Sequence, residues 1–321
     1  MIKKLLIIFW VLAFTGCAST EPAPETNASQ ETKTQTPELA ATSNLGKPIS
    51  KPMIEHLHGI GLAEDGKVLI IATHDGLFLW SDNQWYEPEG VKNDYMGFSA
   101  TREKLLSSGH PGPDSSLKNP VGLMKSTDYG KTWETLSLSG EADFHLMAAS
   151  YGTGTIYTWT QGPNSLMPTK GLYYSLDGIV WDAADMEGMD ADPLALIADP
   201  EKSSRIVAGT LSGSYISADY GKNFNLLLKD QVITGGDFVR DDMDLIAGVL
   251  KEDGSVGLIR VDTENGQTTD LTTPPLAARE YLTYIAVSPV DSNTIFMVTP
   301  LKNGFVSYDG GKTWKQILGG E

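Results

Sequence analysis

The sequence predicts an all-β fold, a six-bladed β-propeller preceded by a disordered tether, and two observations support this. The first is a turn motif, Ser-x-Asp-x-Gly-x-Thr-Trp, complete at 126–133 and 307–314 and weakened at 175–181 and 217–224. Recurrence at a spacing of roughly 40 residues is typical of repeat architectures. The second is a series of short runs rich in Val, Ile, Leu and aromatic residues, without any long stretch of helical period.

The strand-like runs divide the chain after residue 52 into six units. Each unit begins with an apolar segment that we expect to form an inner strand, at 58–62, 96–100, 145–149, 194–198, 235–239 and 284–288. A second strand follows, a third leads into the turn motif and a fourth leaves it. Units one and five have degenerate turns at 81–83 and 261–263. Six units of four strands close into a ring that protects the sheet edges.

The turn motif has a local physical role. Its Asp carboxylate accepts hydrogen bonds from backbone N–H groups of the turn, Gly takes the positive φ and the aromatic ring packs beneath. We therefore expect structural roles for the motif carboxylates Asp128, Asp177, Asp219 and Asp309.

The motif resembles the Asp-box of BNR-repeat β-propellers, a family that includes sialidases and sortilin-type domains, in which the box is structural. The segments 94–98, 107–112, 143–145 and 171–175 closely resemble a group of Gram-positive lipoproteins described as glycosyl-hydrolase-like. That resemblance covers most of 54–318, and the repeats look more distantly like photosystem II assembly factors, which act as binding scaffolds. It implies a propeller, and a hydrolase only by analogy of fold.

The first residues read as a secretory signal, with Lys3 and Lys4 before an apolar run at 5–14. The sequence from Phe14 to Cys17 looks like a bacterial lipobox, which implies a diacylglycerol on Cys17, the only cysteine. We expect a signal peptide at 1–16, lipidated Cys17 with a disordered linker at 17–52, and the propeller at 53–321. The predicted location is the extracytoplasmic face of the cell membrane.

The formal charge of the chain is −17. Such an acidic surface argues against nucleic acid as a partner and favours cations or neutral ligands. We expect a monomer whose ligand is a small molecule, a glycan or a protein.

All five histidines fall within residues 56–145. In a propeller, the loops from the fourth strand to the next first strand share one face with the loops from the second strand to the third. His58, Met96 and His145 take equivalent places at inner-strand starts, and His74 and His110 at second-strand ends. We expect a polar pocket at the channel mouth on this face, with ligand-binding residues His56, His58, His74, Met96, His110, His145 and Asn164.

A metal ion is one ligand that this set favours, because imidazole with Met suits copper and imidazole with carboxylate suits zinc. The metal-binding candidates are His58, His74, Met96, His110 and His145. Strict metal motifs such as His-Glu-x-x-His are absent from the sequence. An organic ligand, and histidines that only hydrogen-bond the backbone, remain alternatives.

An enzymatic role has less support in the sequence. A glycosidase needs two carboxyl groups, and Asp75, Asp94, Asp143 and Glu280 are the catalytic candidates on the histidine face. A sialidase would need three converging arginines, but Arg102, Arg205 and Arg240 lie between first and second strands, on the other face. We therefore favour a non-enzymatic binding or scaffold protein, with glycoside hydrolysis and copper or zinc binding as the alternatives.

Overall fold

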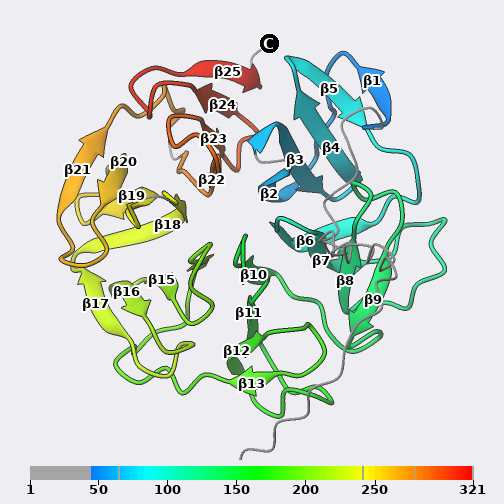
Figure 1. The fold of residues 1–321 in the computed structure, drawn as a ribbon, viewed down its shortest axis with the longest axis horizontal. Coiled ribbons are helices and arrows are strands. Elements are labelled where there is room, and N and C mark those ends of the chain that lie inside the picture. The colour runs from blue at the N-terminus through cyan, green and yellow to red at the C-terminus, as the bar shows by residue number, and fades with distance from the viewer. Residues whose placement is uncertain (1–44, 64–65, 241, 279, 320–321) are drawn as a thin grey trace, which may run out of the picture. The chain divides into compact units, whose positions relative to one another are not determined.

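The computed structural model describes residues 45–63, 66–240, 242–278 and 280–319. It confirms the predicted fold, since six antiparallel sheets are arranged in a ring (Figure 1), and their inner strands line a central channel. The described residues contain no α-helix. Accordingly, none of these segments forms a helix with the length and hydropathy needed to cross a membrane.

Each blade is formed by consecutive strands, the first innermost. The strands of the first three blades are β2 (Leu57–Ala63), β3 (Val68–Thr73), β4 (Gly76–Ser81) and β5 (Gln84–Glu87); β6 (Asp94–Ala100), β7 (Leu105–His110), β8 (Leu123–Ser126) and β9 (Glu134–Ser137); and β10 (Leu146–Ala149), β11 (Ile156–Thr160), β12 (Gly171–Ser175) and β13 (Asp182–Ala183). Those of the last three are β14 (Ala195–Ala198), β15 (Ile206–Thr210), β16 (Gly213–Ser217) and β17 (Asn225–Leu228); β18 (Gln231–Phe238), β19 (Leu245–Lys251), β20 (Val256–Val261) and β21 (Thr268–Leu271); and β22 (Tyr284–Val287), β23 (Ile295–Val298), β24 (Gly304–Ser307) and β25 (Lys315–Leu318).

The second strand of each blade lies inside its sheet, between the first and third strands, and a neighbouring blade covers each of its two faces. All residues of β3, β11, β15 and β23 are buried. This is why they read as short continuous apolar runs and not as an alternation of apolar and polar residues.

The folded part begins earlier than the predicted boundary at residue 53. Leu45 is 4% exposed and packs in the core cluster between the first and second blades. A short strand, β1 (Lys47–Ile49), pairs antiparallel with β5 and gives this blade a fifth strand. The predicted signal peptide, Cys17 and most of the predicted linker lie outside the described residues.

The first and last blades close the ring directly, as Figure 1 shows. Leu62, Phe78 and Trp85 of the first blade share a core with residues of the last blade, including Phe296 and Leu318. The Trp85 indole N–H donates to the carbonyl oxygen of Ile317 over 3.3 Å. The ring therefore closes through side-chain packing, and neither the first nor the last sheet contains a strand from the other end of the described chain.

The Asp-box turns follow the geometry that their sequence predicts. At the second blade, Asp128 Oδ1 accepts from the backbone N–H of Thr132 over 2.9 Å and from Ser126 Oγ over 2.8 Å. Asp177, Asp219 and Asp309 accept equivalent hydrogen bonds in their own turns. Hydrogen bonds lower the pKa of Asp309 to about 2, and the bond from the Thr313 hydroxyl is the largest cause. The carboxylates thus hold the turns as anions.

Candidate functional site

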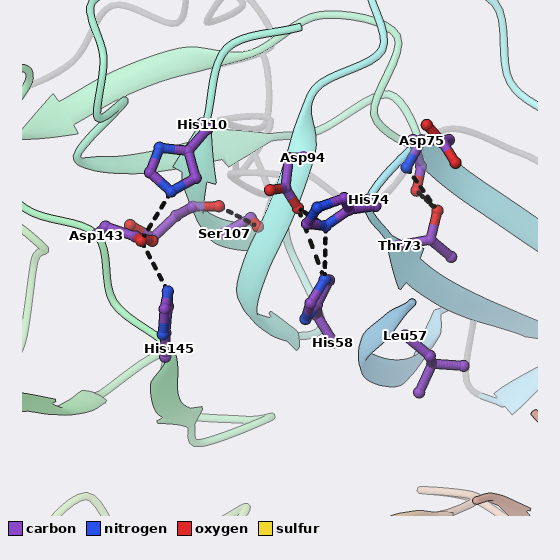
Figure 2. A network of polar contacts seen from close by, with 12 residues as sticks. Leu57, His58, Thr73, His74, Asp75, Asp94, Ser107, His110, Asp143 and His145 are labelled. Carbon is purple, nitrogen blue, oxygen red and sulfur yellow. Dashed lines mark hydrogen bonds and ion pairs between the residues drawn. The ribbon is translucent and has the colours of Figure 1, made fainter. Parts of the chain in front are cut away.

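Two clusters of imidazole and carboxylate groups lie at one mouth of the channel, over the first three blades (Figure 2). The first triad is His58, His74 and Asp94, and the second triad is His110, Asp143 and His145. In each triad, one donor atom per residue lies within 4.8 Å of the other two. The structure therefore brings together four of the five histidines, as two groups instead of one.

The propeller topology places the members of the first triad. His58 lies near the start of the inner strand β2, His74 directly follows β3, and Asp94 is the first residue of the next inner strand, β6. A register shift between Leu57 and Gly59 marks a bulge in β2 at His58. Bulges re-aim side chains, and here the imidazole faces its neighbours.

The first triad is compact and partly desolvated. His58 Nε2 lies 3.0 Å from His74 Nδ1, and His74 Nδ1 lies 2.9 Å from Asp94 Oδ1. The remaining separation, from His58 Nε2 to Asp94 Oδ1, is 3.7 Å. Burial lowers the pKa of His58 to about 4, and the nearby histidines add to the effect. This imidazole is therefore neutral at neutral pH, the form that binds metals.

The second triad is centred on Asp143. Its Oδ2 atom lies 3.0 Å from His110 Nε2 and 2.7 Å from His145 Nε2. The other ring nitrogen of His110, Nδ1, lies 2.7 Å from the amide oxygen of Asn119. Asn119 is the largest cause that raises the pKa of His110, burial opposes it, and the charges of Asp143 and Asp94 add to the rise.

A neutral His110 ring cannot donate a hydrogen bond to both Asn119 and Asp143, because it carries only one N–H. If Nδ1 carries the proton and donates to Asn119, then Nε2 presents a lone pair to the Asp143 oxygen. Either a second proton or a cation between the two atoms removes this conflict. A histidine that donates one N–H to an amide or carboxyl oxygen and presents the other nitrogen to a metal is common in metal sites.

Both carboxylates also have an unsatisfied oxygen. Asp94 Oδ1 and Asp143 Oδ1 are buried atoms without a hydrogen-bond partner among the described residues. Asp94 Oδ1 lies 2.9 Å from His74 Nδ1, a nitrogen that is also 3.0 Å from His58 Nε2. Buried polar atoms are nearly always paired, so an unpaired one points to a proton, a water molecule or an ion.

The donor separations of the triads suit a small cation. A tetrahedral zinc ion at about 2.0–2.1 Å from each donor requires donors about 3.3 Å apart. The observed separations of 2.9, 3.0 and 3.7 Å in the first triad bracket this value. The two separations given for the second triad, 3.0 and 2.7 Å, are slightly shorter.

Three other residues predicted to bind a ligand lie outside the triads. His56 is exposed beside the first triad, its ring centroid 5.4 Å from that of His74. Met96 lies in a register shift of β6, between Tyr95 and Phe98. Asn164 folds back within its own loop, where its Oδ1 accepts from the backbone N–H of Met167 over 2.8 Å.

The predicted catalytic carboxyls separate into two groups. Asp94 and Asp143 belong to the triads. Asp75 is exposed and lies outside them, as Figure 2 shows. Glu280 is buried, and its carboxylate accepts from Thr299, from Asn303 over 2.9 Å and from the backbone N–H of Ala277 over 2.7 Å. Burial raises the pKa of Glu280, but these hydrogen bonds outweigh it and lower the pKa overall.

A cavity of about 270 Å³ occupies the central channel beneath the triads. His58 and His145, one from each triad, line it together with the inner strands of the blades. Asp237 of β18 also lines the cavity, and no motif around it marked it as a candidate. Asn119 was missed as well, because its contact with His110 depends on the path of the long loop after β7.

The ring of six sheets and the Asp-box turns give this protein the fold of a BNR-type β-propeller. The BNR/Asp-box repeat family matches residues 305–316, which comprise the turn of the last blade and parts of the strands β24 and β25 on either side of it. No curated protein matches the chain.

Several solved structures are similar to it. A GH74 enzyme from Niastella koreensis is 16% identical over 85% of this chain and 46% of its own, with a TM-score of 0.56. The gluconolactonase XC5397 from Xanthomonas campestris is 13% identical over 89% of this chain and 96% of its own, with a TM-score of 0.53. The structure of YCF48 bound to D1 peptide is 18% identical over 87% of this chain and 86% of its own, with a TM-score of 0.49.

The chain thus spans less than half the length of the GH74 enzyme. At identities this low, the two likenesses with TM-scores above 0.5 show a shared fold alone.

Proposed function

We propose that the protein is a lipid-anchored, extracytoplasmic propeller that binds divalent transition-metal ions on its histidine face. One observation carries this proposal, namely the convergence of two imidazoles and one carboxylate in each of the two triads. The buried Oδ1 atom of Asp143, which has no hydrogen-bond partner among the described residues, supports it, because a bound cation would satisfy it.

The donor set narrows the choice of metal. Imidazole with carboxylate suits zinc, and imidazole also suits copper(II) and iron(II), whereas oxygen-only sites suit magnesium and calcium. Three protein donors leave a coordination position open for water or a small ligand. The net charge of −17 further favours the approach of a cation.

Metal analysis of tag-free protein tests the proposal. Dialysis against zinc or copper(II), followed by elemental analysis, is expected to show bound metal. A double variant, His74→Ala with His145→Ala, removes one donor from each triad, and we expect its affinity to fall at least about tenfold. Both side chains are largely exposed, at 46% and 63%, so the fold should survive.

His56→Ala is the matched control, because it removes an exposed imidazole beside the first triad that is not one of its members. It is expected to leave metal content unchanged. Wild-type protein without bound zinc or copper, or a double variant that binds as tightly as wild type, would contradict the proposal.

The membrane location is part of the same proposal and depends on Cys17, which lies outside the described residues. We expect Cys17→Ser to move the protein from the membrane fraction to the soluble fraction, because the variant has no thiol to carry a lipid. Detergent phase partitioning of both forms measures this, and equal partitioning would refute the anchor. Hydrolysis of a glycan stays a prediction, with Asp94 and Asp143 as its carboxyl candidates.

A further inference from the structure

We infer that the two triads form one two-ion centre, in which two divalent transition-metal ions bind side by side as an interacting pair. The inference rests on the proposed function, which requires only that each triad binds metal. It adds that the two bound ions are close enough to interact. Three observations place the triads against each other.

The first is the register of the β6–β7 ladder. Asp94 of the first triad is directly opposite His110 of the second triad in this antiparallel pair. Residues directly opposite each other project from the same face, with Cβ atoms about 4.5–5.5 Å apart. One donor of each triad is therefore a cross-strand neighbour of the other.

The second is the attachment of the remaining members of the second triad to the same ladder. Asp143 and His145 flank Phe144, which is 2% exposed. The carbonyl oxygen of Phe144 accepts from the N–H of Gly97 in β6 over 2.7 Å, and its N–H donates to Ser108 Oγ in β7 over 3.0 Å. A Cβ atom at Gly97 would lie 2.4 Å from the Phe144 oxygen, so this close approach requires glycine.

The third is the cavity that the two triads share. His58 of the first triad and His145 of the second both line it. Figure 2 shows the two triads next to each other on one face of the blades.

Two cations this close repel each other, and each triad supplies only one carboxylate to offset the charge. The first ion is therefore expected to bind more tightly than the second, by about tenfold. A variant that retains a single triad should bind one ion, with an affinity close to that of the tighter binding step of the wild-type protein. The weaker binding step should be lost.

Titration with copper(II), followed by electron paramagnetic resonance, tests the pairing. Wild-type protein is expected to bind two ions and to show the broadening and half-field signal of two interacting copper(II) ions. His145→Ala and His74→Ala should each bind one ion with an isolated copper(II) spectrum. His56→Ala should keep two interacting ions, since this imidazole belongs to neither triad.

The outcomes distinguish the inference from the function on which it rests. Two ions with isolated spectra, or a single ion in the wild-type protein, would overturn the pair while leaving metal binding intact. Absence of any bound ion would overturn both.

Discussion

Asp237 lies in the wall of the central channel and links two blades through its carboxylate. Its Oδ1 accepts from the N–H of Phe238 over 2.9 Å, and its Oδ2 accepts from the N–H of Val287 in the last blade over 2.8 Å. Desolvation by the surrounding strands raises the pKa of Asp237 to about 7, although both hydrogen bonds oppose the rise. Near neutral pH the carboxyl is therefore partly protonated in the folded state.

This raised pKa predicts that Asp237 contributes less stability as pH rises. The unfolded chain releases this proton near pH 4, so between about pH 4 and 7 the folded state binds more protons than the unfolded state. The contribution of Asp237 is full below about pH 4 and decreases through pH 7, with a slope of up to about 1.4 kcal/mol per pH unit. Urea unfolding at several pH values measures it.

Asp237→Asn isolates this effect from those of the other carboxylates. The variant keeps one carbonyl acceptor but does not titrate, so its free energy of unfolding should fall less between pH 4.5 and 7 than that of the wild type. Asp270→Asn, at an exposed position of β21, is the control and should keep the wild-type slope. Equal slopes for Asp237→Asn and wild type would show that Asp237 does not titrate in this range.

At the scale of the elements, turns keep their function after their sequence motif has decayed. In the fifth blade, Asp262 still accepts from the N–H of Glu264 over 2.9 Å and from the Asn265 side chain over 2.6 Å. In the first blade, Asp82 and Asn83 take positive φ values of 49° and 60° and form a two-residue hairpin. Strands and turns were predictable because their signals are local.

The face of the site was predictable for a related reason. Every blade runs outward from its inner strand through four consecutive strands, so the position of a residue in its blade determines which mouth of the channel its loop borders. Which side chains of that face contact one another depends on β-bulges, and these have no clear signal in the sequence. Both the bulge of β2 at His58 and that of β6 around Met96 shift the register of their strand pair. The sequence accordingly indicated one pocket of imidazoles, a thioether and carboxylates, where the structure has two triads.

The strand β1 was missed for a different physical reason. It has three residues, includes Pro48 and lies at the outer edge of the first blade. Proline is tolerated at a sheet edge, but it weakens any strand signal in a stretch this short. Only the contacts with β5 reveal the pairing.

On the scale of the whole molecule, six buried clusters form the core, and each joins one pair of neighbouring blades. The interface that closes the ring, between the last and first blades, has a core cluster like the other five. It also has polar ties, including the bond from Lys315 Nζ to Asn83 Oδ1 over 2.8 Å. The ring should therefore unfold as a unit and not open first at its closing interface.

Two phenylalanines of the last blade, each 5% exposed, test this expectation. Phe296 packs in the closing interface, and Phe305 packs against the fifth blade. Replacing either by Ala should lower the free energy of unfolding by about 3–5 kcal/mol, since both remove a buried ring from a dense core. Both variants should unfold in a single transition when followed by tryptophan fluorescence and by circular dichroism in guanidinium chloride. An early separate transition in Phe296→Ala, absent from Phe305→Ala, would instead identify the closing interface as the weak point of the ring.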